Sequence, residues 1–89
     1  MAKTREEKLY AISDAALNQN FKDEIEDIDI LEYADENGRI WEDRFDYIDA
    51  TTIPITVHFI GGEVNEYFSV PIGRLTKKSV NRLYNMINR

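Results

Sequence analysis

The chain has 89 residues, 17 acidic and 11 basic side chains, a formal net charge of −6 and no cysteine. This length predicts one domain, residues 1–89, because typical domains hold about 100–150 residues. Without cysteine, disulfides, thiolate nucleophiles and cysteine-ligated zinc are excluded. The N-terminus lacks the apolar run of a signal peptide and no stretch is long enough to span a membrane, so we expect a cytoplasmic protein without membrane association.

The acidic side chains are concentrated in one segment. Residues 23–49 carry twelve carboxylates against two arginines, which gives this segment a net charge of −10. The residues before it sum to +1, and the residues after it sum to +3. Such a charge distribution bears on solubility and on association with basic partners rather than on the fold.

The first predicted element is a helix. Thr4 followed three residues later by Glu7 is typical of a capping box at a helix start. The apolar side chains that follow recur at helical spacing, namely Leu9, Ile12, Ala16 and Leu17. The polar cluster at residues 18–20 predicts the end of this helix.

The segment from Phe21 to Leu31 fits two patterns. Its apolar residues match a helical stripe, whereas Ile28 and Ile30 alternate with aspartates as in a strand. We favour a strand from about Ile28, because the turn signal at residues 35–38 follows it closely. Gly38 can adopt the left-handed conformation that a type I turn with a bulge requires.

This turn predicts a hairpin with a defined register. Counting outward places Asp35 opposite Arg39 and Tyr33 opposite Trp41, both favourable cross-strand pairs. The alternative, a two-residue Asn-Gly turn, would oppose like charges, although the preferred register also opposes Glu32 to Glu42. On the second strand we expect one packed face and one solvated face, with Trp41, Asp43, Phe45 and Tyr47 on the first and Glu42, Arg44 and Asp46 on the second.

A second hairpin is predicted around the Gly61-Gly62 pair, taken as a two-residue turn. This turn pairs residues whose numbers sum to 123, so the packed face holds Phe59 with Val64, Val57 with Glu66, Ile55 with Phe68 and Ile53 with Val70. Pro54 indicates that its strand is an edge strand or begins nearby. Because Glu66 falls on the packed face, we expect it to reach the rim or to pair with a base.

The last element is a helix that follows the strand break at residues 71–73. Thr76 can cap it, and an apolar stripe at helical spacing follows, formed by Val80, Leu83, Tyr84 and Ile87. Its other face is basic, with Lys78, Arg82 and Arg89. The predicted fold class is therefore α+β: an N-terminal helix, a four-stranded antiparallel sheet of two hairpins and a C-terminal helix, in a two-layer sandwich.

No catalytic, metal or cofactor motif is present. The sequence lacks a phosphate-binding glycine loop, a His-Glu-x-x-His pair and a nucleophile elbow. The carboxylates from Asp27 onward do not match a calcium loop, because Glu32 stands where glycine is needed. His58, the single histidine, falls opposite the packed face and is expected to be a half-covered strand residue. We therefore predict a protein that is not an enzyme and holds no cofactor or metal.

The leading hypothesis for function is docking of the acidic segment on a basic protein surface. Carboxylates on one face of a strand lie about 6.5–7 Å apart, near the spacing of phosphates along a nucleic-acid strand. In size and charge, though in no motif, the chain resembles phage-encoded inhibitors of restriction or CRISPR nucleases. The expected partner-binding residues are Asp27, Asp29, Glu32, Asp35, Glu36, Glu42, Asp43 and Asp46.

Three alternatives remain open. The acidic face could serve only solubility. A second class of function is nucleic-acid binding through the basic C-terminal helix, with Lys77, Lys78, Arg82 and Arg89 on phosphates, although the many acids make direct nucleic-acid binding a weaker expectation. A third is self-assembly through an exposed sheet edge. The sequence does not predict an oligomeric state.

Overall fold

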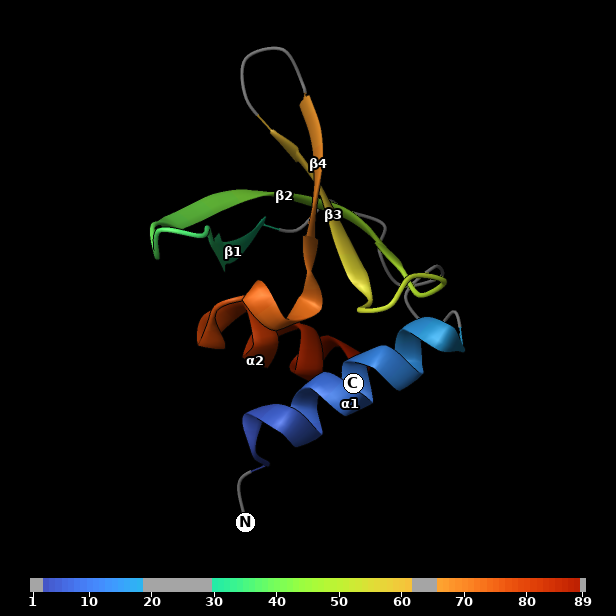
Figure 1. Ribbon diagram of the computed structural model, residues 1–89. Helices are drawn as coiled ribbons and strands as arrows, with labels where there is room; N and C mark the ends of the chain where they lie inside the picture. Colours follow the sequence, from blue (N-terminus) through green and yellow to red (C-terminus); the bar gives the residue numbers. More distant parts are fainter. Residues whose placement is uncertain (1–2, 19–29, 62–65, 89) are drawn as a thin grey trace.

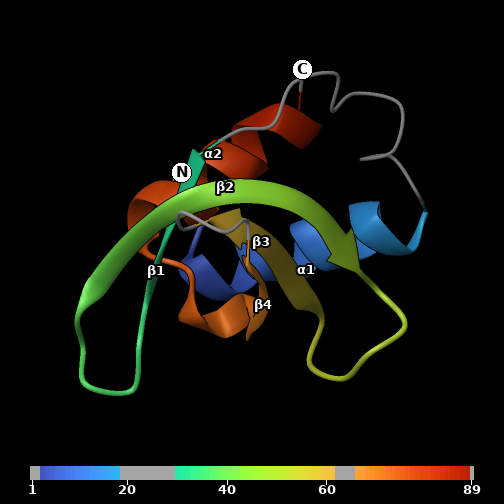
Figure 2. The same ribbon diagram turned by 90° about the horizontal axis from the view of Figure 1, so that it is seen from above.

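The computed structural model describes residues 3–18, 30–61 and 66–88. The elements follow in the order α1 (Arg5–Leu17), β1 (Ile30–Ala34), β2 (Ile40–Asp49), β3 (Thr56–Gly61), β4 (Glu66–Pro71), the short 3-10 helix η1 (Ile72–Arg74) and α2 (Lys77–Ile87). The strands form one antiparallel sheet in the order β1-β2-β3-β4. Both helices lie on one side of it (Figure 1 and Figure 2). The predicted α+β fold is confirmed, whereas the choice between helix and strand at residues 21–29 lies outside the described residues.

Both helices begin as the capping signals predict. Thr4 accepts a hydrogen bond from the Glu7 N–H, and Thr76 accepts one from the Ser79 N–H. The apolar stripe of α2 is buried at Val80 and Leu83. A capped, amphipathic helix is stabilised mainly by packing its apolar face.

The first hairpin has the predicted register. Tyr33 pairs with Trp41, Glu32 pairs with Glu42, and the Asp35 N–H donates to the Arg39 carbonyl at 2.9 Å. Gly38 has a φ of 80°, a left-handed conformation that glycine adopts without steric cost. The local turn chemistry therefore specifies this pairing.

A β-bulge in β2 changes the predicted face of one aromatic residue. Phe45 pairs with Phe59, but Tyr47 pairs with His58, so Asp46 is the extra residue. The prediction that Tyr47 shares the packed face with Phe45 is wrong, because an extra residue reverses the alternation of the strand. Tyr47 is 50% exposed and stacks on the His58 ring at 4.2 Å between centroids.

The second hairpin has a different register from the predicted one. Phe59 pairs with Phe68, Val57 pairs with Val70, and Gly61 pairs with Glu66. The pairing is displaced by four residues because Gly61 belongs to β3 instead of forming a turn with Gly62. An even displacement keeps every side chain on its predicted face, so Phe59 and Phe68 still pack together, with rings stacked at 5.4 Å.

Two smaller expectations for this hairpin are confirmed. Glu66 is exposed at the start of β4, as expected for a carboxylate at the rim. Strand β3 begins at Thr56, two residues after Pro54, so the proline precedes an interior strand and removes no ladder hydrogen bond from it.

The core lies between the sheet and the two helices. It contains an aromatic cluster in which the Tyr33 ring lies 4.8 Å from the Phe59 ring and 5.3 Å from the Phe68 ring. The described core residues are Ile12, Ala15, Leu31, Tyr33, Phe45, Val57, Phe59, Val70, Ile72, Leu75, Val80, Leu83 and Met86. Arg5 also joins α1 to the segment before α2 by donating to the carbonyls of Gly73 and Leu75 at 2.8 Å.

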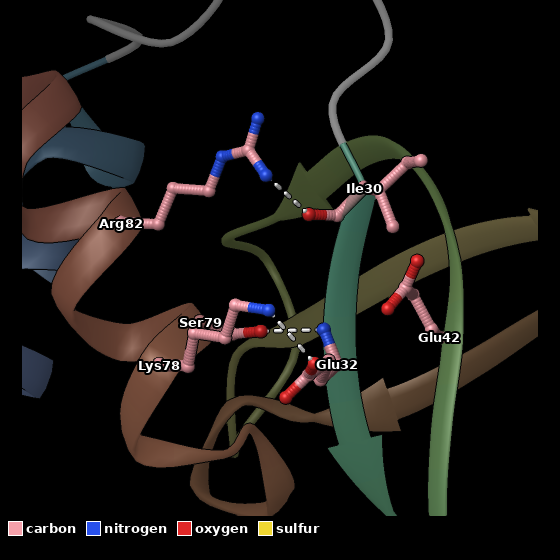
Figure 3. A pocket seen from close by; sticks show the side chains of 6 residues that line it. All are labelled: Ile30, Glu32, Glu42, Lys78, Ser79 and Arg82. Atoms are coloured by element: carbon pink, nitrogen blue, oxygen red, sulfur yellow. Dashed lines mark hydrogen bonds and ion pairs between the residues drawn. The ribbon is translucent and has the colours of Figure 1, made fainter.

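Helix α2 covers the free edge of β1. The Ser79 hydroxyl accepts from the Glu32 N–H, and the Thr76 N–H donates to the Glu32 carbonyl. Arg82 donates to the Ile30 carbonyl at 2.9 Å (Figure 3). These groups take the place of a neighbouring strand, so this edge is not open to further pairing.

Candidate protein-docking hairpin

The acidic hairpin consists of β1, β2 and the turn between them, residues 30–49. It carries seven carboxylates and two arginines. Its turn reaches past the ends of both helices (Figure 1 and Figure 2). This placement exposes the turn region to a partner, while the base of the hairpin packs in the core.

Glu32 is neutralised within the molecule. Its carboxylate accepts from Lys78 Nζ at 3.1 Å (Figure 3). It also accepts from the Thr76 hydroxyl at 3.3 Å. The side chain is 22% exposed. Because a partner's base would have to displace Lys78, Glu32 is a poor docking group.

Asp35 organises the turn. Its carboxylate accepts from the backbone N–H groups of Asn37 and Arg39 and from Trp41 Nε1, each at 2.9 Å. The hydrogen bond from Trp41, followed by those from the backbone, lowers the pKa of Asp35 below its ordinary value. All of these bonds favour the charged carboxylate, so this residue has a structural role in the turn.

Asp43 lies over β3 on the helix-facing side of the hairpin. A Cβ built on Gly61 would clash with the Asp43 carboxylate, so the absence of a side chain at Gly61 makes room for this carboxylate. Burial raises the pKa of Tyr33 to about 12, and the charge of Asp43 and a hydrogen bond to its carboxylate add to this effect. Gly61 was predicted to form a turn, whereas in the structure it allows a close approach between strands.

Three further carboxylates of the predicted site are Glu36, Glu42 and Asp46. Glu36 and Glu42 are exposed and Asp46 is half-buried at the bulge. Within the described part of the chain, none of the three forms an ion pair. Asp27 and Asp29 lie outside the described residues.

The predicted site residues are divided between the two faces of the hairpin. Glu32 and Glu42 are cross-strand partners on the open face of the sheet, whereas Asp43 pairs with Leu31 and shares its face. Alternation along a strand requires this division. A docking partner would therefore meet the carboxylates around the turn and along the open face rather than one flat array.

Two apolar side chains at the turn were not predicted as part of the site. Ile40 is 58% exposed and Trp41 is 41% exposed. The Arg39 guanidinium lies over the Trp41 ring at 4.8 Å from its centroid, a favourable cation–π distance. Trp41 was predicted on the packed face, and its pairing with Tyr33 confirms that face. It is nevertheless exposed, because the helices do not extend this far along the hairpin.

A pocket of about 150 Å³ separates the open face of the hairpin from α2 (Figure 3). Its lining combines two carboxylates with two cations and comprises Ile30, Glu32, Glu42, Lys78, Ser79 and Arg82. The basic face of α2 is thus turned toward the hairpin at Lys78 and Arg82. These bases bond to Glu32 and to the Ile30 carbonyl, which leaves less of the predicted phosphate-binding stripe free.

A polar cluster that sequence reasoning missed surrounds His58 on the open face. Its Nδ1 lies 2.7 Å from the Ser69 hydroxyl, and its Nε2 lies 3.9 Å from Asp49 Oδ2. Hydrogen bonds from Thr51 lower the pKa of Asp49. His58 is half-covered, as predicted, but only the bulge brings Tyr47 over its ring. No set of three metal-ligating side chains converges in residues 3–18, 30–61 and 66–88.

Comparisons with protein families, with curated proteins and with solved structures gave no match. Neither described helix has the length and apolar character needed to cross a membrane.

Proposed function

We propose that this protein is a non-catalytic binding module of the cytoplasm whose acidic hairpin docks on a basic surface of a partner protein. The observation that supports this proposal most directly is a combination of charged and apolar side chains along the hairpin. Three carboxylates that form no ion pair with any described residue, Glu36, Glu42 and Asp46, lie on the same projecting hairpin as the exposed Ile40 and Trp41.

The apolar side chains favour a protein partner. Protein interfaces combine a few buried aromatic or aliphatic anchors with a polar rim, and tryptophan is enriched among the residues that contribute most. Trp41 and Ile40 could provide such an anchor, and the surrounding carboxylates would steer the hairpin toward a basic surface. The most concrete form of the proposal is a nucleic-acid-handling protein whose phosphate-binding groove the hairpin blocks, as an inhibitor that imitates DNA.

The alternative of direct nucleic-acid binding has less support. Lys78 pairs with Glu32, and Arg82 bonds to the Ile30 carbonyl. A surface with few free cations beside many carboxylates attracts phosphates weakly. A direct DNA-binding measurement at low salt separates the two functions, since the docking proposal predicts no binding.

The test begins with capture of the partner by the tagged protein and elution by salt. The captured protein is then titrated with a triple variant, Glu36→Gln, Glu42→Gln and Asp46→Asn. The matched control changes three exposed acids of α1, Glu6→Gln, Glu7→Gln and Asp14→Asn, and so removes the same charge.

We expect the hairpin triple variant to raise the Kd at least about tenfold, because rim charges of this kind contribute mainly to association. The control variant should bind almost as well as the unchanged protein. Equal weakening by both variants would mean that only net charge matters. Competition between the protein and a DNA duplex for the partner would support the inhibitor form, and simultaneous binding of both would contradict it.

A further inference from the structure

The two edges of the sheet differ in how their backbone groups are satisfied. On β1, both outward-facing groups of Glu32 are bonded to α2, and the Ile30 carbonyl accepts from Arg82. Strand β4 is the opposite edge. Within the described residues, no hydrogen bond reaches its outer side.

The outward groups of β4 can be identified from its pairing with β3. The Ile72 N–H donates to the Ile55 carbonyl at 2.8 Å, in the register in which Pro71 faces Thr56. Bonding alternates along an antiparallel strand. The backbone groups of Phe68 and Val70 therefore face β3, whereas those of Tyr67 and Ser69 face outward.

The side chains of β4 do not protect this edge. Tyr67 is 68% exposed, and Ser69 is exposed as well. Edge strands are ordinarily protected by lysines, by proline or by a covering element. Here the one charged residue is Glu66, at the start of the strand, and Pro71 is at its end, so the centre of the strand is open to pairing.

We propose that β4 pairs antiparallel with β4 of a second copy of this chain, which joins the two sheets into one of eight strands. The register that uses every outward donor sets Tyr67 opposite Ser69 of the partner copy and forms four backbone hydrogen bonds. It places Phe68 opposite its own equivalent, an aromatic pair of a favourable kind. Pro71, which has no N–H, stays outside these four bonds.

Charge also favours a second copy as the occupant. In this register Glu66 faces Val70, and the two Glu66 residues lie about 13 Å apart along the strands at roughly 3.3 Å per residue. The acidic hairpin forms the edge of the sheet opposite to β4. The two strongly acidic segments therefore lie at opposite ends of the dimer. Within β4 itself, residues 66–71, this register therefore places no like charges opposite each other.

The test compares Tyr67→Pro with Tyr67→Thr. Both variants remove the exposed aromatic side chain, but only proline removes the outward N–H, and neither touches a hydrogen bond to β3. Sedimentation from micromolar to millimolar concentration measures association. Amide exchange reports on the fold through the inward N–H groups of Phe68 and Val70, and on the dimer through those of Tyr67 and Ser69.

We expect the unchanged protein and Tyr67→Thr to dimerise with rising concentration, with protection appearing at the outward amides of residues 67 and 69. Tyr67→Pro should keep its inward amides protected. Its dimer dissociation constant should rise by about tenfold or more, because two backbone hydrogen bonds are lost per dimer. The proposal is overturned by a protein that stays monomeric throughout, by a dimer whose outward β4 amides exchange freely, or by equal association of the two variants.

Discussion

At the scale of single residues, Tyr33, Asp43 and Gly61 form one unit across three strands. The Tyr33 ring is buried in the core, yet its hydroxyl reaches the Asp43 carboxylate, which lies over Gly61. The arrangement depends on the missing Cβ at Gly61. A small residue in a strand often marks such a close approach.

We expect Gly61→Ala to lower the pKa of Tyr33 from about 12, while burial keeps it above the ordinary value. The added methyl group would displace Asp43 and remove its charge and hydrogen bond from the tyrosine. Titration of the tyrosine ring carbons by NMR measures this pKa. Gly73→Ala is the matched control, because a Cβ at Gly73 meets nothing within 4 Å. An unchanged Tyr33 pKa in Gly61→Ala would show that Asp43 has no part in the shift.

The same tyrosine makes stability depend on pH in the alkaline range. Because the pKa of Tyr33 is about 12 in the folded chain and near 10 when unfolded, the unfolded state loses its proton first. This contribution is complete below pH 10 and is lost as pH rises from about 10 to 12. Denaturant unfolding across this range should show the decline, and Tyr33→Phe should remove this part of it.

Asp35 makes stability depend on pH in the acid range, where its contribution increases as pH rises. Its pKa is lowered by bonds from Trp41 and the turn backbone, so its stabilising effect is present above the ordinary carboxyl pKa and is lost as pH falls below it. We expect Asp35→Ala to reduce the melting temperature at neutral pH and to reduce its acid dependence. Glu36→Ala, one residue further along the same turn, should change neither. A pH profile of Asp35→Ala that matches the unchanged protein would contradict this assignment.

At the scale of elements, one buried hydroxyl contributes a key hydrogen bond to the contact between α2 and β1. Ser79 is 2% exposed and accepts from the Glu32 N–H. It therefore replaces the neighbouring strand that β1 lacks. Thr76 has two roles beside it: its side chain caps the helix, and its N–H donates to the Glu32 carbonyl at the sheet edge.

We expect Ser79→Ala to lower the free energy of unfolding by about 1–3 kcal/mol, because it leaves a half-buried N–H without its partner. Asn85→Ala, on the exposed side of the same helix, controls for helix propensity and should change stability little. Urea unfolding measures both. Faster amide exchange at Glu32 in Ser79→Ala would show that the stability loss comes from the unpaired Glu32 N–H. An exchange rate equal to that of the unchanged protein would contradict this role of Ser79.

At the scale of the whole molecule, the two proposed interactions occupy opposite ends of the sheet and have different physical origins. The acidic hairpin would act through charge and through Trp41, whereas the β4 edge would act through backbone hydrogen bonds. Raising the ionic strength should therefore weaken partner docking and leave dimerisation unchanged or stronger, because salt screens the repulsion between two chains of charge −6. Binding and sedimentation titrations in low and high salt check both. Dimerisation that weakens with salt as docking does would contradict this separation.

The local signals of the chain determine its elements. The caps at Thr4 and Thr76, the turn with Gly38 and the register of the first hairpin all act over a few residues, and each can be recognised in the sequence. The bulge at Asp46 and the register of the second hairpin are different. They depend on which side chains of β2, β3 and β4 fit together in the core, a contact between segments far apart along the chain.

The same division holds for the candidate site. The sequence by itself located the acidic segment, because charge is a property of composition. Only the tertiary structure decided which carboxylates are free, since Lys78 reaches Glu32 across 46 residues and Asp43 enters a space that Gly61 leaves. It also decided that, of the two sheet edges, the β1 edge is the one that α2 covers. Local patterns determine elements, and long-range packing determines which of their groups remain available to a partner.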